Sequence, residues 1–160
     1  MYLPTPESHE FGHFSSAQGA ILSDIADIMI PKTETVGAAE TKVVLLLDQL
    51  MLSWAGEATK REVDAFIESL SQYVLATFQT DYLNLPKQDR QALLAEIDAA
   101  SFSDEPDRMP VKSYRRIKWL IFHMHYTSEA ANPDFVLIPG QYAGDLSEAE
   151  YLALVAENRY

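Results

Sequence analysis

Residues 63–78 read VDAFIESLSQYVLATF, and this stretch decides the fold class of the chain. Its apolar side chains recur every three or four residues, which is the period of one face of an α-helix. The pattern predicts a helix of about five turns that packs against a core along its length. The side chains expected to face inward are Val63, Phe66, Ile67, Leu70, Val74 and Phe78.

Helix start and stop signals divide the rest of the N-terminal half. Ser15 or Ser16 is expected to cap a first helix, which Pro31 ends. A second helix is expected to end before Gly56. Thr59 with Glu62 then has the spacing of a capping box, which predicts the start of the long helix.

The second of these helices is apolar nearly all round. Val43, Leu47, Leu50, Met51 and Trp54 form one expected face. Four further apolar residues cover much of the remaining surface. A helix of this kind is usually buried on more than one side. The four apolar residues outside the expected face are Val44, Leu45, Leu46 and Leu52.

The C-terminal half continues the helical pattern. One helix is expected from about Pro86 to Ala99, and Ser113 is expected to cap the next. Ser147 and Glu150 repeat the capping-box spacing before a last short helix.

The sequence therefore predicts an all-α, single-domain bundle of about six helices. Residues 1–14 are expected to form an irregular N-terminal arm, and 15–160 the helical domain. The part of the domain after Glu129 is expected to be irregular up to the last helix.

Composition limits the chemistry of the chain. Its 160 residues carry a formal net charge of -12 and include no cysteine. The acidic balance argues against nucleic-acid binding, because phosphate contacts need a basic surface. Without cysteine the chain cannot hold an iron–sulfur cluster through thiolates or attach haem covalently. Glycine-rich phosphate or dinucleotide motifs are missing too, so we expect no cofactor in this chain.

Residues 9–13, His-Glu-Phe-Gly-His, match the H-E-x-x-H pattern of zinc proteases. There His9 and His13 would bind zinc from one helical turn, with Glu10 as general base. The match lies in a polar arm with two prolines, which disfavours the helix that this site needs. We therefore expect a solvated arm, and a zinc-dependent hydrolase is the alternative.

The fifth predicted helix carries two histidines and the one basic cluster. His123 and His125 lie about 200° apart around a helix, so they cannot share a metal ion. We expect one partly buried histidine and one that is exposed or at an interface. The cluster either meets an acidic partner or solvates its own face. Its members are Lys112, Arg115, Arg116 and Lys118.

From Ser15 onward the sequence resembles the gluconate 2-dehydrogenase subunit 3 family. Four stretches carry the resemblance in the family's order, over roughly residues 15–145. In the first stretch Glu34 replaces the usual aspartate and Val36 the usual proline, and in the second Leu85 replaces a capping serine. The stretches are ILSDIADIMIPKTETVGA at 21–38, LPKQDRQALL at 85–94, HYTSE at 125–129 and IPGQYAG at 138–144.

The resemblance implies an accessory role. Family members are small, non-catalytic subunits of periplasmic or membrane-bound dehydrogenases that oxidise sugars. The large partner, a glucose-methanol-choline type flavoprotein, holds FAD; the sequence leaves open whether it also holds an iron–sulfur cluster. A cytochrome c or another acceptor takes the electrons. The small subunit is expected to support maturation and to carry the partner through the twin-arginine route. The residues after Met1 show no such leader, so the periplasmic location is an expectation from the family.

The third and fourth stretches are the expected contact with the large subunit, and the alternative is that both segments fold back onto the helices of this chain. An aromatic residue such as Tyr142, presented by a Pro139-Gly140 turn, is typical of interface hot spots. A free-standing helical binding module is the remaining alternative, and no segment is apolar enough to span a bilayer. The candidate interface residues are Tyr126, Thr127, Ser128, Glu129, Pro139, Gly140 and Tyr142.

Overall fold

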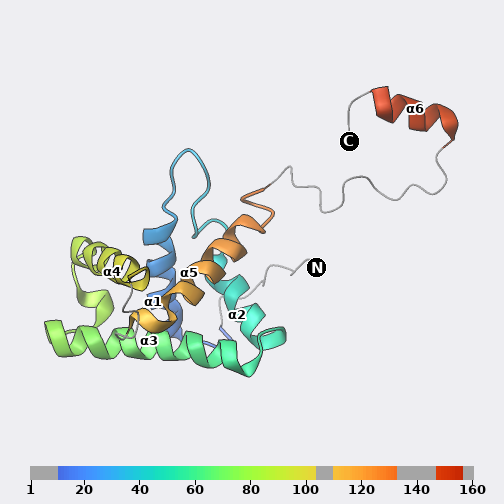
Figure 1. Ribbon diagram of the computed structural model, residues 1–160. Helices are drawn as coiled ribbons and strands as arrows, with labels where there is room; N and C mark the ends of the chain where they lie inside the picture. The colour runs from blue at the N-terminus through green and yellow to red at the C-terminus, as the bar shows by residue number, and fades with distance from the viewer. Residues whose placement is uncertain (1–10, 104–109, 133–146, 157–160) are drawn as a thin grey trace.

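The computed structural model describes residues 11–103, 110–132 and 147–156 (Figure 1). Within these ranges the chain forms α-helices and one short 3-10 helix, and no strand. The predicted all-α class is therefore confirmed. The elements are α1 (Ser16–Met29), α2 (Val43–Ser53), α3 (Glu57–Phe78), η1 (Tyr82–Asn84), α4 (Lys87–Ser101), α5 (Val111–Tyr126) and α6 (Glu148–Ala156).

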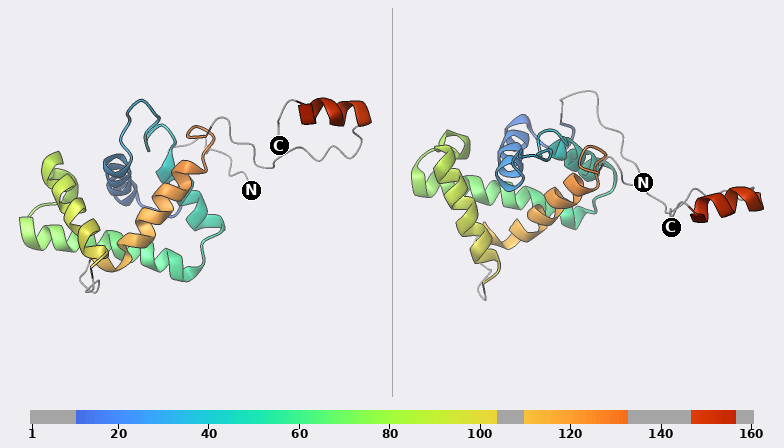
Figure 2. Two further views of the ribbon diagram at one scale, coloured as in Figure 1. Left: turned by 45° about the horizontal axis from the view of Figure 1, so that its top comes forward. Right: turned by 90° about the horizontal axis from the view of Figure 1, so that it is seen from above.

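Helix α5 lies at the centre of the bundle. It packs against α2, α3 and α4, while α1 packs against α2 and α3 (Figure 1). The longest helix, α3, runs beneath the others in this view. Helix α6 lies apart from α1–α5 in all three views (Figures 1 and 2).

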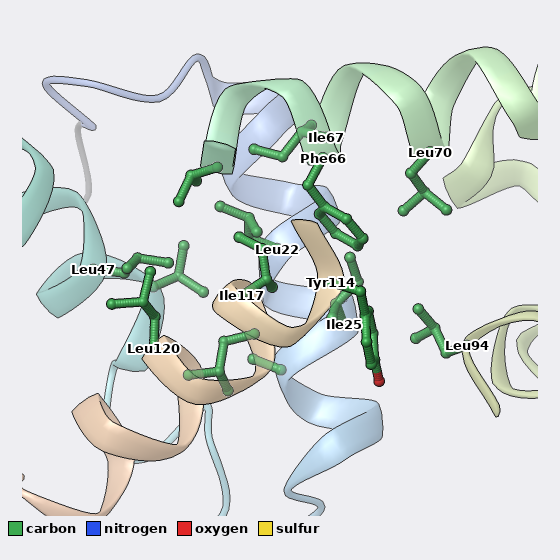
Figure 3. Close-up of a cluster of buried hydrophobic side chains, with 14 of the residues drawn as sticks. Leu22, Ile25, Leu47, Phe66, Ile67, Leu70, Leu94, Tyr114, Ile117 and Leu120 are labelled. Carbon is green, nitrogen blue, oxygen red and sulfur yellow. The ribbon is translucent and has the colours of Figure 1, made fainter. Parts of the chain in front are cut away.

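The core forms where α1, α3 and α5 meet (Figure 3). Phe66 of α3 lies against Tyr114 of α5, with ring centroids 5.9 Å apart. Leu22, Ile25 and Ile117 fill the space beside them and are fully buried. The predicted inward stripe of α3 is thus confirmed from Val63 to Val74, since all five of its residues there are buried.

The predicted burial was wrong for the last side chain of two apolar faces, in α3 and α2. Phe78 is 43% exposed, because α3 ends there and the left-handed Gln79 turns the chain away. Trp54 is 59% exposed for a similar reason, since it follows the last turn of α2. Leu52 is exposed as well, so only the first half of α2 is buried on more than one side.

Two of the predicted helix starts are confirmed. Ser15 caps α1, accepting a hydrogen bond from the Gln18 N–H at 3.2 Å while its own N–H donates to the Gln18 side chain at 2.8 Å. Ser147 and Glu150 form the same reciprocal pair before α6. In both places a short polar side chain stands directly before the first helical residue.

Two other predicted starts were wrong, each by three residues. Helix α3 begins at Glu57, with Gly56 before it, so Thr59 lies inside the first turn. Helix α5 begins at Val111 after Pro110, so Ser113 lies inside that helix. Proline has no N–H that needs a cap and is suited to the first turn. Pro110 and Val111 are both buried at this start.

Asp48 binds the N-terminal segment that leads into the bundle. It is the carboxylate that ends the apolar run of α2, and it is only 4% exposed. Its two oxygens accept hydrogen bonds from the backbone N–H groups of Gly12, His13 and Phe14 at 2.9–3.0 Å. A buried carboxylate is stabilised by such donors, so residues 12–14 of the predicted arm are tied to α2.

A loop over residues 30–42 connects α1 to α2. The Ala38 N–H donates to the Ile30 carbonyl at 3.0 Å, which closes the base of the loop. At Gly37 a Cβ atom would lie 2.6 Å from the backbone nitrogen of Lys32, so only glycine fits without moving the backbone. Residues 31–35, in contrast, are exposed.

Candidate partner interface

The outer face of α5 carries aromatic side chains in two neighbouring rows. Trp119 stacks on His123, with ring centroids 4.8 Å apart and planes 8° apart. Phe122 stacks on Tyr126 at 6.0 Å. Trp119 is 55% and Tyr126 57% exposed, although both are large rings. We call these four residues the α5 ridge.

The inner face of the same helix is a different environment. Ile117, Ile121 and Met124 are buried in the core. His125 is 3% exposed, and its Nδ1 lies 3.0 Å from the hydroxyl oxygen of Thr41. Burial holds the pKa of His125 below its ordinary value, because the charged imidazolium loses its water.

Cations gather where the α5 ridge meets the start of the helix. The Arg115 guanidinium lies 4.8 Å, and the Lys118 ammonium 5.4 Å, from the centre of the Phe102 ring. Phe102 itself is 63% exposed. Lys118 also pairs with Asp98 at 2.6 Å, and Arg116 with Glu62 at 3.0 Å. The basic cluster is therefore partly neutralised within the chain, while Arg115 extends the ridge with a cation.

A shallow groove runs beside the ridge, between α1, α4 and α5. Phe122 belongs to both features, since it stacks in the ridge and lines the groove. Most of the lining is apolar, and the Asp98–Lys118 pair lies on one side. We call it the α4–α5 groove. Its apolar lining consists of Ile28, Met29, Leu94, Ala95 and Phe122.

The predicted interface residues 126–129 divide into two groups. Tyr126, Thr127 and Glu129 are exposed, and Ser128 is half-buried. Thr127 and Ser128 end the helix: their hydroxyls donate to the carbonyls of His123 and His125, both at 2.6 Å. Their visible contacts are thus those of a helix terminus, where carbonyls lack partners along the helix. Whether any of the four touches a partner stays a prediction.

The other predicted interface residues, Pro139, Gly140 and Tyr142, lie outside the described residues. So do His9 and Glu10 of the zinc-protease pattern. Of its two histidines, His13 is described, and its Nε2 lies 3.1 Å from Asp64 Oδ1 of α3. Residues 11–14 are not helical. Across the described ranges no group of three or more His, Asp or Glu side chains could hold a metal ion.

Hydrogen bonds tie each of the first three family-like stretches into the bundle. The Arg90 guanidinium donates to both carboxylate oxygens of Asp24, at 2.9 and 2.8 Å, which connects α4 to α1. The Tyr82 hydroxyl donates to the same carboxylate at 3.0 Å. The Thr41–His125 contact connects the turn before α2 to the end of α5. The stretches thus act first as joints of the bundle.

The sequence reasoning missed the α5 ridge as a surface. Ile117, Leu120 and Met124 form the core stripe of α5. The sequence reasoning named Tyr126 as a candidate contact and expected one of the two histidines to be exposed, but it gave Trp119 and Phe122 no role. The signal was present, because Trp119, His123 and Tyr126 repeat at helical spacing on the side away from that core stripe. A second aromatic stripe on a helix that already has a buried one indicates a surface for another molecule.

The comparisons with known proteins identify the family. The family model described as gluconate 2-dehydrogenase subunit 3 matches residues 16–140. The chain belongs to this family. No curated protein matches the chain, and no solved structure matches it.

Membership fixes a coarse role for the chain. The matched range includes all of α1–α5, and therefore the α5 ridge and the α4–α5 groove; α6 lies beyond it. The family description is that of a subunit in a dehydrogenase complex, which indicates an accessory protein. In the parts of the chain that the structure describes, no helix combines the length and apolarity needed to cross a bilayer.

Proposed function

We propose that this chain is the non-catalytic small subunit of a flavin-dependent sugar or sugar-acid dehydrogenase, and that the α5 ridge binds the large subunit. The observation that carries the proposal is the family match over residues 16–140. In the complex, FAD belongs to the large glucose-methanol-choline type subunit. That subunit oxidises the sugar and passes electrons to a cytochrome c or another acceptor.

The small subunit supports folding, maturation or export of the large one, and the complex works in the periplasm. An accessory protein with this role needs a surface that recognises a folded partner. The α5 ridge has the required chemistry, because exposed aromatic rings flanked by an arginine are enriched at interface hot spots. Trp119 and Tyr126 would each lose a large apolar area to the partner.

The test is co-expression of the chain with the flavin-dependent large subunit of its own source, with an affinity tag on the large subunit. We expect the two to purify together, and the large subunit to gain flavin content and yield from the small one. Trp119→Ala should weaken the complex about 30-fold, the equivalent of about 2 kcal/mol. Binding is measured by calorimetry on the purified subunits.

Leu75→Ala is the matched control. Leu75 is 57% exposed on α3, much as Trp119 is exposed on α5, but it lies outside the ridge. This variant should bind the large subunit as the wild type does. A wild-type chain that never associates with the large subunit, and leaves its flavin content and yield unchanged, would refute the proposed function.

A further inference from the structure

Helix α6 is an apolar helix that lies away from the bundle. Residues 151–156 read YLALVA, six apolar or aromatic residues in succession, and Leu152 is 57% exposed. The helix has only 9 residues and lies apart from α1–α5 (Figures 1 and 2). Isolated helices shorter than about 12–15 residues are marginal in water, and most gain their stability from packing. Such a helix therefore needs an apolar surface to cover.

The charges of the two segments are complementary. Helix α5 carries four Lys or Arg residues and no Asp or Glu, and Arg116 and Lys118 of these already pair with Glu62 and Asp98. Residues 133–160 carry five Asp or Glu and one Arg. Two of these acids, Glu148 and Glu150, lie in the first turn of α6. Opposite charges of this kind select the orientation of a contact more than its strength.

The connection is long enough for α6 to reach α5. Residues 133–146 span at most about 46–50 Å, at about 3.3–3.6 Å per residue. Helix α5 has 16 residues and is roughly 24 Å long, at 1.5 Å per residue. Glu148 and Glu150 can therefore lie beside Arg115 at the start of α5, with the apolar residues of α6 following along the ridge.

We propose that in the free subunit α6 folds back over the α5 ridge and the α4–α5 groove of its own chain. Its acidic first turn lies beside Arg115, and its apolar residues cover Trp119 and Phe122. A short tether gives α6 a high effective concentration at this surface, so a weak contact is enough to hold it. The large subunit then displaces α6 when it binds. This displacement rests on the proposed function, whereas the covering of the ridge does not.

Tryptophan quenching tests the covering in the full-length free chain. The chain has two tryptophans, so Trp54→Phe leaves Trp119 as the only one. In this background Leu152→Glu should expose Trp119 to acrylamide and shift its emission to longer wavelength. Leu75→Glu makes the same change on α3 at a residue that is also 57% exposed, and it should alter neither signal. Equal quenching in all three proteins would overturn the covering.

Disulfide trapping identifies the occupant, because the natural chain has no cysteine. Leu152→Cys with His123→Cys should oxidise to a crosslink within one chain, and Leu152→Cys with Leu75→Cys should not. Dimers linked between chains would mean that α6 covers a second copy, and no crosslink would mean that it covers nothing. Either result overturns the proposal.

The displacement has its own outcome. The double variant His123→Cys with Leu152→Cys should fail to bind the large subunit when oxidised, and reduction should restore binding. If the reduced and wild-type chains also fail to bind while the crosslink still forms, the proposed function fails and the covering stands. If the oxidised protein binds as well as the reduced one, the displacement is wrong.

Discussion

Both faces of α5 carry aromatic and histidine residues, but these residues have different roles on the two faces. The inner face buries Tyr114, Ile117 and His125, and it gives His125 a hydrogen-bond partner in Thr41. The outer face leaves Trp119 and His123 stacked on each other and open to solvent. An aromatic or histidine residue thus stabilises the bundle or forms a surface according to what neighbouring helices place beside it.

The sharpest contrast between the faces is in stability. Ile121→Ala removes a fully buried side chain and leaves a cavity in the core, so the free energy of unfolding should fall by about 3 kcal/mol. Trp119→Ala on the outer face should change it by much less, because Trp119 is 55% exposed on the bundle. Urea unfolding followed by circular dichroism measures both. Similar losses in the two variants would show that the faces are not distinct.

A smaller effect is expected from the polar contact of the inner face. Thr41→Val keeps the shape of the side chain but leaves Nδ1 of His125 without the hydroxyl, which should cost about 1–3 kcal/mol. Thr35→Val, in the exposed part of the same turn, is the control and should cost less than about 0.5 kcal/mol. If the two variants unfold at the same urea concentration, the contact adds no stability.

The smallest expected effect is on the pH dependence of stability, to which His125 and His123 should contribute differently. Burial lowers the pKa of His125 below 6.5, so the unfolded chain binds its proton more readily than the folded chain. The stability that neutral His125 allows is present above pH 6.5. It is lost as pH falls from there toward the folded pKa. His125→Gln should remove this part of the pH dependence in urea unfolding at pH 7.5 and 5.5.

His123→Gln is the matched variant on the outer face, since His123 is exposed and stacked on Trp119. It should keep the wild-type loss of stability between the two pH values. A His125→Gln protein that loses as much stability as the wild type would show that burial of His125 does not drive the acid response.

Local patterns in the sequence predicted the fold class and the core stripe of α3, because burial at every third or fourth residue is dictated by the helix itself. They failed where packing decides. Thr59 and Ser113 have good capping chemistry, yet Gly56 and Pro110 start those helices earlier. Trp54 continues an apolar face in sequence, but α2 ends before it.

Links between distant residues could not be predicted at all. Asp48 interrupts an apolar run, and nothing near it in the sequence shows that its partners are the N–H groups of residues 12–14. The same holds for Arg90 and Asp24, which are 66 residues apart. The α5 ridge, in contrast, was visible in the spacing of its aromatic residues. The other predicted interface residues, Pro139, Gly140 and Tyr142, lie outside the described residues and stay predictions.

In the loop between α1 and α2, some positions tolerate a change of residue and one does not. Gly37 is locked, because any side chain there would strike the backbone of Lys32. Glu34 is exposed and Val36 half-exposed, so replacing either changes little beyond the loop surface. Substitutions at the exposed positions of this loop should therefore leave the path of the backbone unchanged, because Gly37 and the Ala38–Ile30 hydrogen bond fix its base.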